Sequence, residues 1–249
     1  ATVNTTPTIT STTDATVCGN VGATLSATAS AGTLYWYTLA SGGTAFATGT
    51  SIPVSGGSFT FYVEAISNGC VSTRVPVVYT NNPIPTITSL TPAGRCDSGT
   101  VTLQATTDIG TVNWYDAPTG GNLVGTGTSF TTPSLTSTTT YYVESSSASC
   151  TTPTRTAVTA TINEQPVITS TTPASRCGDG SVALQATASI GTIYWYNAPT
   201  GGTLVATGGT FATPILGGTT TYYVEVVNGI CTSARTAVVA TVYAVSVIT

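Results

Sequence analysis

Six cysteines are the residues of this chain whose type and spacing best allow chemistry. They come two to each segment of about 80 residues, in the order Cys18 and Cys70, Cys96 and Cys150, Cys177 and Cys231. Cysteines in such a regular pattern are typical of disulfides in an oxidising compartment. A zinc site fits poorly, because the sequence has no His and no C-x-x-C motif. We therefore predict disulfides, with no metal site and no cofactor site.

The other residue types argue against catalysis. Without His or Lys, the chain excludes hydrolase triads and Schiff-base chemistry. Glu64, Glu144 and Glu225 occur once in each segment, so they do not form the close carboxylate pair of a glycosidase, and we interpret them as solvent-facing strand residues. The remaining acidic residues form no D-x-D-x-D-G calcium loop. We predict that the chain has no catalytic residues and is not an enzyme.

The charge balance excludes another class of function. Only 5 residues are Lys or Arg and 9 are Asp or Glu, giving a net charge of −4. This leaves no basic surface for nucleic acid. No apolar run reaches the length of a membrane span, so we expect no membrane insertion in this segment. Abundant Thr and Ser must keep the surface hydrated.

The cysteines belong to a unit that occurs three times. Each unit has a Trp 18 residues after its first cysteine and a Tyr-Val-Glu motif before its second. Such self-similarity marks a repeat array. We predict domains at residues 1–80, 81–162 and 163–243. Residues 244–249 are expected to start a fourth repeat, because Val247-Ile248-Thr249 matches Val167-Ile168-Thr169.

Short Val-, Thr- and Tyr-rich runs separated by Gly and Pro predict strands rather than helices. In the second unit these strands are expected at residues 85–90, 100–106, 112–115, 122–126, 129–132, 138–145 and 155–162. Seven short strands in about 80 residues are typical of a β-sandwich. Short linkers at 81–83 and 163–166 carry Pro83 and Pro166, so we expect the units to form an elongated, semi-rigid rod.

The repeated motif resembles a known domain family. It reads P-x-I-T-S, R-C, L-x-A-T, W-Y-x-A-P-T-G-G, T-T-T-Y-Y-V-E, C and R-T-A-V, as in residues 166–238, and covers essentially the whole chain. It resembles the immunoglobulin-like repeats of giant surface proteins of Bacteroidota, including adhesins of the gliding-motility kind. The first repeat departs from the motif, for example at Thr16-Val17-Cys18 and Phe61-Tyr62.

The resemblance implies an all-β fold of three tandem immunoglobulin-like β-sandwiches, with Trp36, Trp114 and Trp195 in their cores. It implies a secreted protein at the cell surface, exported by a type IX system. It does not imply a ligand, because such repeats often serve only as spacers.

An immunoglobulin-like topology separates the two cysteines of one repeat. The places of the usual disulfide hold Leu103 and Val143 in the second repeat, and Cys96 and Cys150 lie seven residues beyond these places in opposite directions. Because these two strands run the same way, the displacements add to about 14 residues, or roughly 45 Å. A disulfide requires Cα atoms within about 7 Å.

The same topology suggests that cysteines pair between consecutive repeats. Stacked end to end, Cys18 would face Cys150 and Cys96 would face Cys231. Cys70 and Cys177 would then pair with flanking repeats. A bridge within each repeat stays open as the alternative, and it requires a different strand order or a long excursion before the second strand.

Arginines and tyrosines supply the remaining candidate contacts. We expect four arginines at the joints between repeats, where they could pair with Asp97, Asp179 or carbonyl groups: Arg95, Arg155, Arg176 and Arg235. Strand alternation places further side chains outward as a candidate ligand face: Tyr35, Tyr37, Tyr115, Tyr194 and Tyr196, with Tyr62, Tyr142 and Tyr223 on the neighbouring strand. Such aromatics either bind sugars or form cross-strand pairs.

These features favour a structural stalk or spacer in a long extracellular adhesin or filament. Two alternatives are a carbohydrate-binding module that uses the outward tyrosines and a sheath or fibre protein that assembles laterally. The expected partners are neighbouring repeats of the same chain, with surface polysaccharide and identical chains as further candidates.

Overall fold

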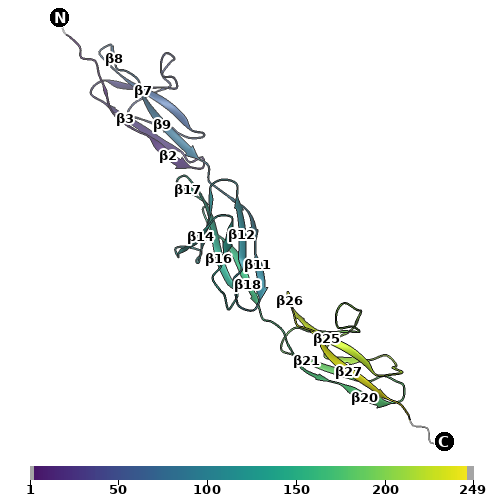
Figure 1. Cartoon of the computed structure of the whole chain (residues 1–249). Helices are drawn as coiled ribbons and strands as arrows, with labels where there is room; N and C mark the ends of the chain where they lie inside the picture. The colour runs from purple at the N-terminus through teal and green to yellow at the C-terminus, as the bar shows by residue number, and fades with distance from the viewer. Residues whose placement is uncertain (1–2, 246–249) are drawn as a thin grey trace. The chain divides into compact units, whose positions relative to one another are not determined.

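The computed structural model describes residues 3–245, and every regular element within that range is a β-strand. The strands form three tandem immunoglobulin-like β-sandwiches (Figure 1). Most of the predicted start of a fourth repeat, at residues 244–249, lies outside the described residues.

Domain one is built from a small and a large sheet. The small sheet has the strand order β1 (Ile9–Thr13), β3 (Ala23–Ala29), β6 (Ser51–Val54). The large sheet has the order β2 (Ala15–Cys18), β9 (Val75–Asn82), β7 (Phe59–Ser67), β4 (Thr33–Tyr37), β5 (Ala47–Thr48), and β8 (Cys70–Val71) pairs with β7.

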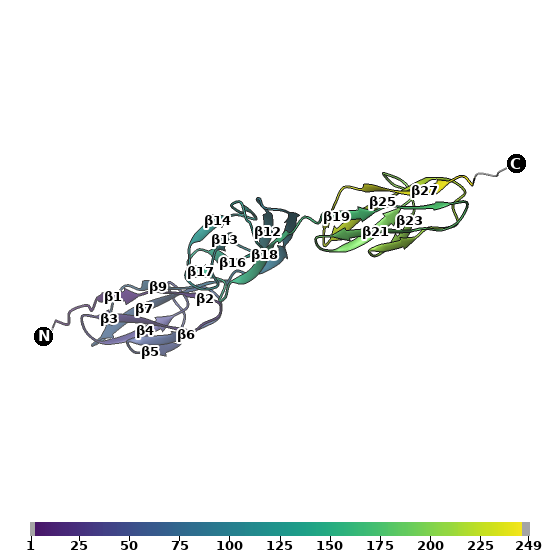
Figure 2. The same ribbon diagram turned by 90° about the horizontal axis from the view of Figure 1, so that it is seen from below.

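Domain three repeats this arrangement. Its small sheet has the order β19 (Ile168–Thr172), β21 (Ala183–Ala188), β24 (Thr210–Ala212). Its large sheet has the order β20 (Ala174–Cys177), β27 (Thr236–Tyr243), β25 (Thr220–Asn228), β22 (Thr192–Tyr196), β23 (Leu204–Thr207), and β26 (Cys231–Thr232) pairs with β25. Figure 2 shows these strands from a second side.

Domain two has the same strand order. Its small sheet consists of β10 (Ile87–Thr91), β12 (Thr102–Thr107), β15 (Ser129–Thr131). Its large sheet consists of β11 (Ala93–Cys96), β18 (Thr156–Asn163), β16 (Thr139–Ser147), β13 (Thr111–Tyr115), β14 (Leu123–Thr126), with β17 (Cys150–Thr151) paired to β16.

Alternation of apolar and polar residues explains why these runs form two packed layers. In β21, Leu184 and Ala186 are buried while Gln185 and Thr187 are exposed. The apolar face of the small sheet packs on Trp195 and its neighbours in the large sheet. Trp36, Trp114 and Trp195 have no exposed surface. Leu103 and Val143, at the positions of the usual immunoglobulin disulfide, are also fully buried.

The first strand of each domain divides between the two sheets. β1 pairs antiparallel with β3 in the small sheet, whereas β2 pairs parallel with β9 in the large sheet. The same change occurs from β19 to β20. The sequence predicts only one strand here, because runs such as Ala93-Gly94-Arg95-Cys96 have little β character. The second of the two strands, β2, β11 or β20, places the first cysteine of each domain beside the end of the domain's last strand.

The described chain divides into two compact units, and the border between them crosses domain two. Unit 1 combines residues 1–89 with 106–114 and 143–156. Unit 2 combines residues 90–105, 115–142 and 157–249. Each unit therefore contains one terminal domain, one linker and the part of domain two that contacts them.

Candidate functional site: the cysteine joints

Two disulfides join consecutive domains. One links Cys18 of domain one to Cys150 of domain two, with Cα atoms 5.7 Å apart. The other links Cys96 of domain two to Cys231 of domain three, with Cα atoms 5.6 Å apart. These are the pairs named by the hypothesis of bonds between repeats, and the alternative bridge within a repeat does not occur in either unit. Cys70 and Cys177 are free thiols.

We call the Cys18–Cys150 connection joint one and the Cys96–Cys231 connection joint two. In joint one, the parallel pairing of β2 with β9 positions Cys18. Cys18 lies opposite Asn82, the residue at which β9 ends and the linker begins. The next amide, that of Gly19, donates a 2.8 Å hydrogen bond to the Asn82 carbonyl. Gly19 adopts φ +58°, and the linker residue Ile84 fills the space where a Cβ would point. Cys18 is thus held beside the C-terminal end of β9, where the chain leaves domain one.

A tight hairpin positions the second partner. Ser147 pairs with Cys150 across a two-residue turn whose first residue, Ala148, has φ +51°. Such turns require positive φ and match the twist of the strands. Cys150 Sγ lies 4.0 Å from the Asn82 carbonyl oxygen, and Cys18 Sγ lies 3.8 Å from that of Ser149. One linker carbonyl therefore contacts both halves of the joint.

Joint two has the same construction. Cys96 lies opposite Asn163, and the Asp97 amide donates to the Asn163 carbonyl at 2.9 Å. Cys231 Sγ lies 4.0 Å from the same oxygen. Two further contacts cross the linker: Asn228 Nδ2 donates to the Glu164 carbonyl at 3.2 Å, and Gln165 Nε2 donates to that of Thr232 at 2.9 Å. The hairpin cysteines Cys150 and Cys231 are fully buried in these joints.

The expected role of the arginines is half wrong. Arg95 and Arg176 do contact carbonyl groups at or beside a cysteine: Arg95 Nε donates to the Cys96 carbonyl at 3.4 Å, and Arg176 Nε donates to the Gly178 carbonyl at 3.0 Å. Arg155 and Arg235 lie instead within their own domains, where they pair with Glu144 and Glu225 at 3.1 and 3.0 Å. The sequence has no register signal for these pairs, because each arginine directly precedes one strand while its glutamate lies 10 or 11 residues earlier in the adjacent strand.

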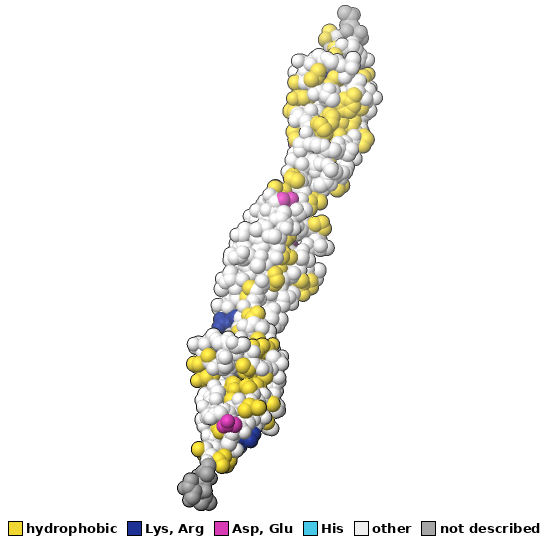
Figure 3. Space-filling model, turned by 90° about the vertical axis from the view of Figure 1, so that its right-hand side faces the viewer, with side chains coloured by type: hydrophobic (Ala, Val, Ile, Leu, Met, Phe, Trp, Pro, Cys, Tyr) yellow, Lys and Arg dark blue, Asp and Glu magenta, His cyan; other side chains and the backbone are white. Residues whose placement is uncertain are grey.

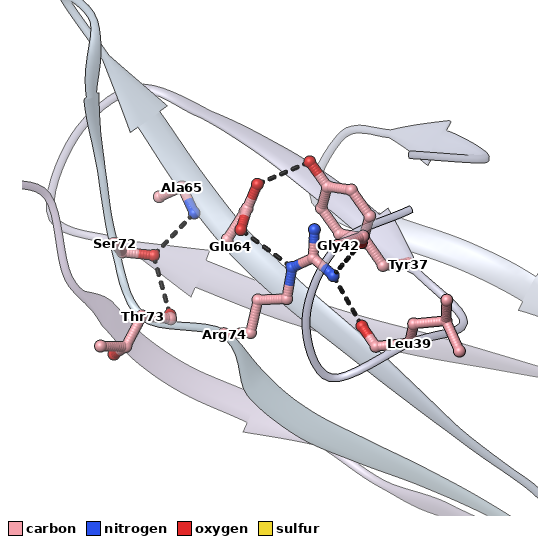
Figure 4. A network of polar contacts seen from close by, with 8 residues as sticks. All are labelled: Tyr37, Leu39, Gly42, Glu64, Ala65, Ser72, Thr73 and Arg74. Atoms are coloured by element: carbon pink, nitrogen blue, oxygen red, sulfur yellow. Dashed lines mark hydrogen bonds and ion pairs between the residues drawn. The ribbon is translucent and has the colours of Figure 1, made fainter. Parts of the chain in front are cut away.

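The prediction that the three glutamates face solvent is therefore wrong, because each is paired with an arginine and largely buried. Glu64 pairs with Arg74 Nε at 2.9 Å, and both side chains are only 12% exposed (Figure 4). The same guanidinium donates to the Leu39 and Gly42 carbonyls at 2.7 and 2.8 Å. Its carbon lies 3.4 Å from the centroid of the Tyr37 ring. Figure 4 shows how this cluster ties a loop to the large sheet.

Domain three carries the same cluster. Arg235 pairs with Glu225, donates to the Ala198 and Gly201 carbonyls at 2.7 Å each, and covers the Tyr196 ring at 3.5 Å. Burial and the hydrogen bond to Glu225 raise the pKa of Tyr196. In domain one the hydrogen bond that the Tyr37 hydroxyl donates to Glu64, at 2.5 Å, is the largest cause that raises the pKa of Tyr37.

These clusters correct the prediction of an exposed tyrosine face. Tyr37 is only 7% exposed, and arginines cover the rings of Tyr37 and Tyr196. The others, Tyr35, Tyr115 and Tyr194, are half-buried. Cross-strand pairing is observed instead: Tyr37 lies opposite Tyr62, and Tyr196 lies opposite Tyr223.

Residues 3–245 lack the features of two other kinds of site. In that range no three Cys, Asp or Glu side chains gather into a group that could hold a metal ion. No helix suited to crossing a membrane is found there. Charged side chains are sparse on the face shown in Figure 3, where polar uncharged and apolar groups predominate.

Comparison with known proteins agrees with the division into three domains. The family model described as "Ig-like domain CHU_C associated" matches residues 5–83, 84–163 and 164–243. No curated protein matches the chain. Among solved structures, a three-domain I-band fragment of titin superimposes with a TM-score of 0.52 at 11% identity, covering 98% of this chain and 100% of the fragment. An E-to-A variant of the same titin fragment gives a TM-score of 0.50 at 11% identity, covering 96% and 99%. These likenesses show the fold alone.

Proposed function

The chain belongs to the family of Ig-like domains described as CHU_C associated, and we propose that it is a structural spacer segment of a long extracellular cell-surface protein. Its work is mechanical: it holds other parts of the protein at a distance from the cell. In this role the domains form a semi-rigid rod, and their partners are neighbouring domains of the same chain.

The observation that carries the proposal is that each disulfide bonds two consecutive domains. A disulfide that serves folding closes a loop within one small domain. Here Cys18–Cys150 and Cys96–Cys231 span 132 and 135 residues and add a second covalent connection beside each linker. A second connection restricts how two domains bend and twist relative to each other. A spacer needs this restriction, whereas a disulfide within one domain does not provide it.

The chemistry of the surface supports the same role. Stable disulfides favour an oxidising, extracellular location. With 14 charged residues among 249, the chain offers little that would recognise a charged ligand. Within the proposal, the whole protein is a cell-surface adhesin of the gliding-motility kind, secreted by a type IX system. No specific observation favours the sugar-binding or sheath alternatives, because arginines cover two of the proposed platform tyrosines.

Small-angle X-ray scattering tests the spacer function. We compare the oxidised chain with the double variant Cys18→Ser/Cys96→Ser, which lacks both joints. The control is Cys70→Ser/Cys177→Ser, which removes only the free thiols. We expect the joint variant to have a broader distance distribution and a wider range of sizes, while the control matches the original chain. Identical distributions for all three proteins would refute a role of the disulfides in holding the domains in line.

A further inference from the structure

We propose that Cys70 and Cys177 are the two complementary halves of the same joint, each built to bond a further Ig-like domain of this family that is joined to it in one polypeptide. Cys70 would bond the first cysteine of a preceding domain. Cys177 would bond the hairpin cysteine of a following domain. The inference deepens the proposed spacer function by naming the partner at each end, and it rests on the geometry of the two formed joints.

Cys70 lies in the same local structure as the bonded hairpin cysteines. It pairs with Ser67 across the two-residue turn Asn68-Gly69, whose residues have φ +46° and +79°. Its Sγ lies 3.9 Å from the Asn4 carbonyl oxygen, as Cys150 and Cys231 lie 4.0 Å from those of Asn82 and Asn163. Asn4 Nδ2 also donates to the Asn68 carbonyl at 3.2 Å. This end of the chain therefore has the local structure of the hairpin half of a joint, the half that Cys150 and Cys231 supply.

Cys177 lies in the same local structure as the other two partners. It pairs with Tyr243 at the end of β27, as Cys18 pairs with Asn82 and Cys96 with Asn163. The Gly178 amide donates to the Tyr243 carbonyl at 2.9 Å. The Val245 side chain lies close to Gly178, just as Ile84 lies close to Gly19 in joint one. This end of the chain therefore has the local structure of the other half of a joint, the half that Cys18 and Cys96 supply.

Cys70 and Cys177 are each more exposed than the corresponding cysteines of the formed joints, which a neighbouring domain covers. The bonded hairpin cysteines are 1% and 0% exposed, whereas Cys70 is half-buried. Cys18 and Cys96 are half-buried, whereas Cys177 is exposed. Each unpaired thiol is thus more exposed than the bonded cysteines at the same place in the formed joints.

The shared linker carbonyl identifies the partner as a domain in the same polypeptide. In joint one a single oxygen, that of Asn82, accepts from the Gly19 amide and contacts Cys150 Sγ. At the free ends these two contacts are made by different residues, Tyr243 beside Cys177 and Asn4 beside Cys70. If two separate chains formed the bond, Tyr243 of one chain and Asn4 of the other would have to occupy the position that Asn82 alone fills in joint one. In a continuous chain a single linker residue fills that position, so we commit to the continuous arrangement.

Bond formation requires an oxidant, for which we name a small-molecule disulfide such as oxidised glutathione. The Cys70 thiolate attacks one sulfur of glutathione disulfide, giving a mixed disulfide and one reduced glutathione. The thiolate of the Cys177-type partner then attacks the Cys70 sulfur of that mixed disulfide and releases the second glutathione. Two protein thiols are oxidised, and one glutathione disulfide is reduced to two thiols.

The test is a tandem of two copies, in which Val242 of the first copy is followed directly by Asn4 of the second. This junction recreates the Asn found at both existing joints, Asn82 and Asn163. The single chain has two free cysteines, so an unbonded tandem would carry four free thiols and a bonded tandem two. After oxidation with glutathione disulfide we expect two cysteines outside protein disulfides, counted in the intact mass as free or glutathione-bonded, together with a peptide that links Cys177 of the first copy to Cys70 of the second.

Two controls make the result decisive. Cys177→Ser in the first copy should leave three cysteines outside protein disulfides, free or glutathione-bonded, and a near-UV circular dichroism spectrum equal to twice that of the single chain verifies folding. Separate chains at about 10 μM should bond at least 100-fold more slowly than the tandem, because the tandem's effective concentration is about millimolar. Four such cysteines in the folded tandem would overturn the proposal. Bonding of separate chains at the tandem's rate would overturn the choice of an in-line partner. Neither result depends on the scattering test of the spacer function.

Discussion

The two disulfides should limit how far the chain can be stretched. The cross-linked intervals, residues 18–150 and 96–231, overlap in domain two. When the chain is pulled from its ends and fully unfolded, the tension follows the shortest covalent route. That route runs to Cys18, crosses to Cys150, goes back to Cys96 and crosses to Cys231.

The structure fixes the size of the effect. The route contains about 90 residues, namely the two ends and the stretch between Cys96 and Cys150, which gives roughly 310 Å at about 3.4 Å per residue. After reduction all 249 residues extend, to roughly 850 Å. Cys18→Ser leaves only the second disulfide, so about 114 residues and roughly 390 Å remain in the route.

Single-molecule force spectroscopy, with handles at the two termini, measures these contour lengths with and without a reductant. The control is Cys70→Ser/Cys177→Ser, which should keep the limit near roughly 310 Å, because neither residue lies in a disulfide. Bridges within each repeat would give a similar limit for the original chain. With those bridges, however, the control variant would keep only Cys96–Cys150 and reach roughly 660 Å. That length would refute the connectivity on which the spacer function rests.

Three further perturbations test the domains themselves. Arg235→Ala should destabilise domain three by about 2–3 kcal/mol in denaturant unfolding, because it removes the ion pair and the cover of Tyr196; Arg235→Lys should recover only part of this. Gly191→Ala should destabilise far more than Gly208→Ala in thermal melts: both have φ +96°, but only at Gly191 would the Cβ meet a backbone carbonyl. Since the pKa of Tyr37 and of Tyr196 is raised on folding, their contribution to stability is complete below about pH 10 and is lost as the pH rises through the folded-state value, which alkaline unfolding curves would show. A stability that stays constant above that pH would contradict the last of these.

Periodicity was sufficient to predict most strands. The seven strands expected in domain two all occur, with ends that differ by two residues or fewer, because each is rich in β-forming residues and flanked by turn-forming residues such as Gly, Pro or Ser. Counting seven residues from Leu103 and Val143 also indicated which cysteines could not meet. That argument needs only the strand direction and a rise per residue. It holds although β11 was missed, because Cys96 still lies at the far end of its domain.

Contacts across strands could not be predicted in the same way. Arg235 is far from Ala198 in sequence, and its ion pair with Glu225 depends on the register of β25 against β27. A shift of one residue would move Glu225 to the other face of the sheet. The hairpin at Cys70 did carry a local signal, since Asn68-Gly69 is a favoured two-residue turn. The turn at Cys150, Ala148-Ser149, lacks that dipeptide. In domain three Asn228-Gly229 is shifted by one residue, so that Gly229-Ile230 form the turn.

Each joint combines two covalent connections, of which only the disulfide is broken by reduction. Both the linker and the disulfide survive unfolding of either domain. In joint one both connections meet at Asn82, whose carbonyl contacts each half. Loosening the hairpin of domain two therefore leaves Cys18 and Cys150 bonded, so the domain refolds with its partner still held close. Because the loop closed by each disulfide exceeds 130 residues, its closure lowers the entropy of the unfolded chain by the equivalent of about 5 kcal/mol. That contribution appears only when both bonded domains are unfolded together, so each disulfide stabilises the bonded pair against complete unfolding rather than one domain alone.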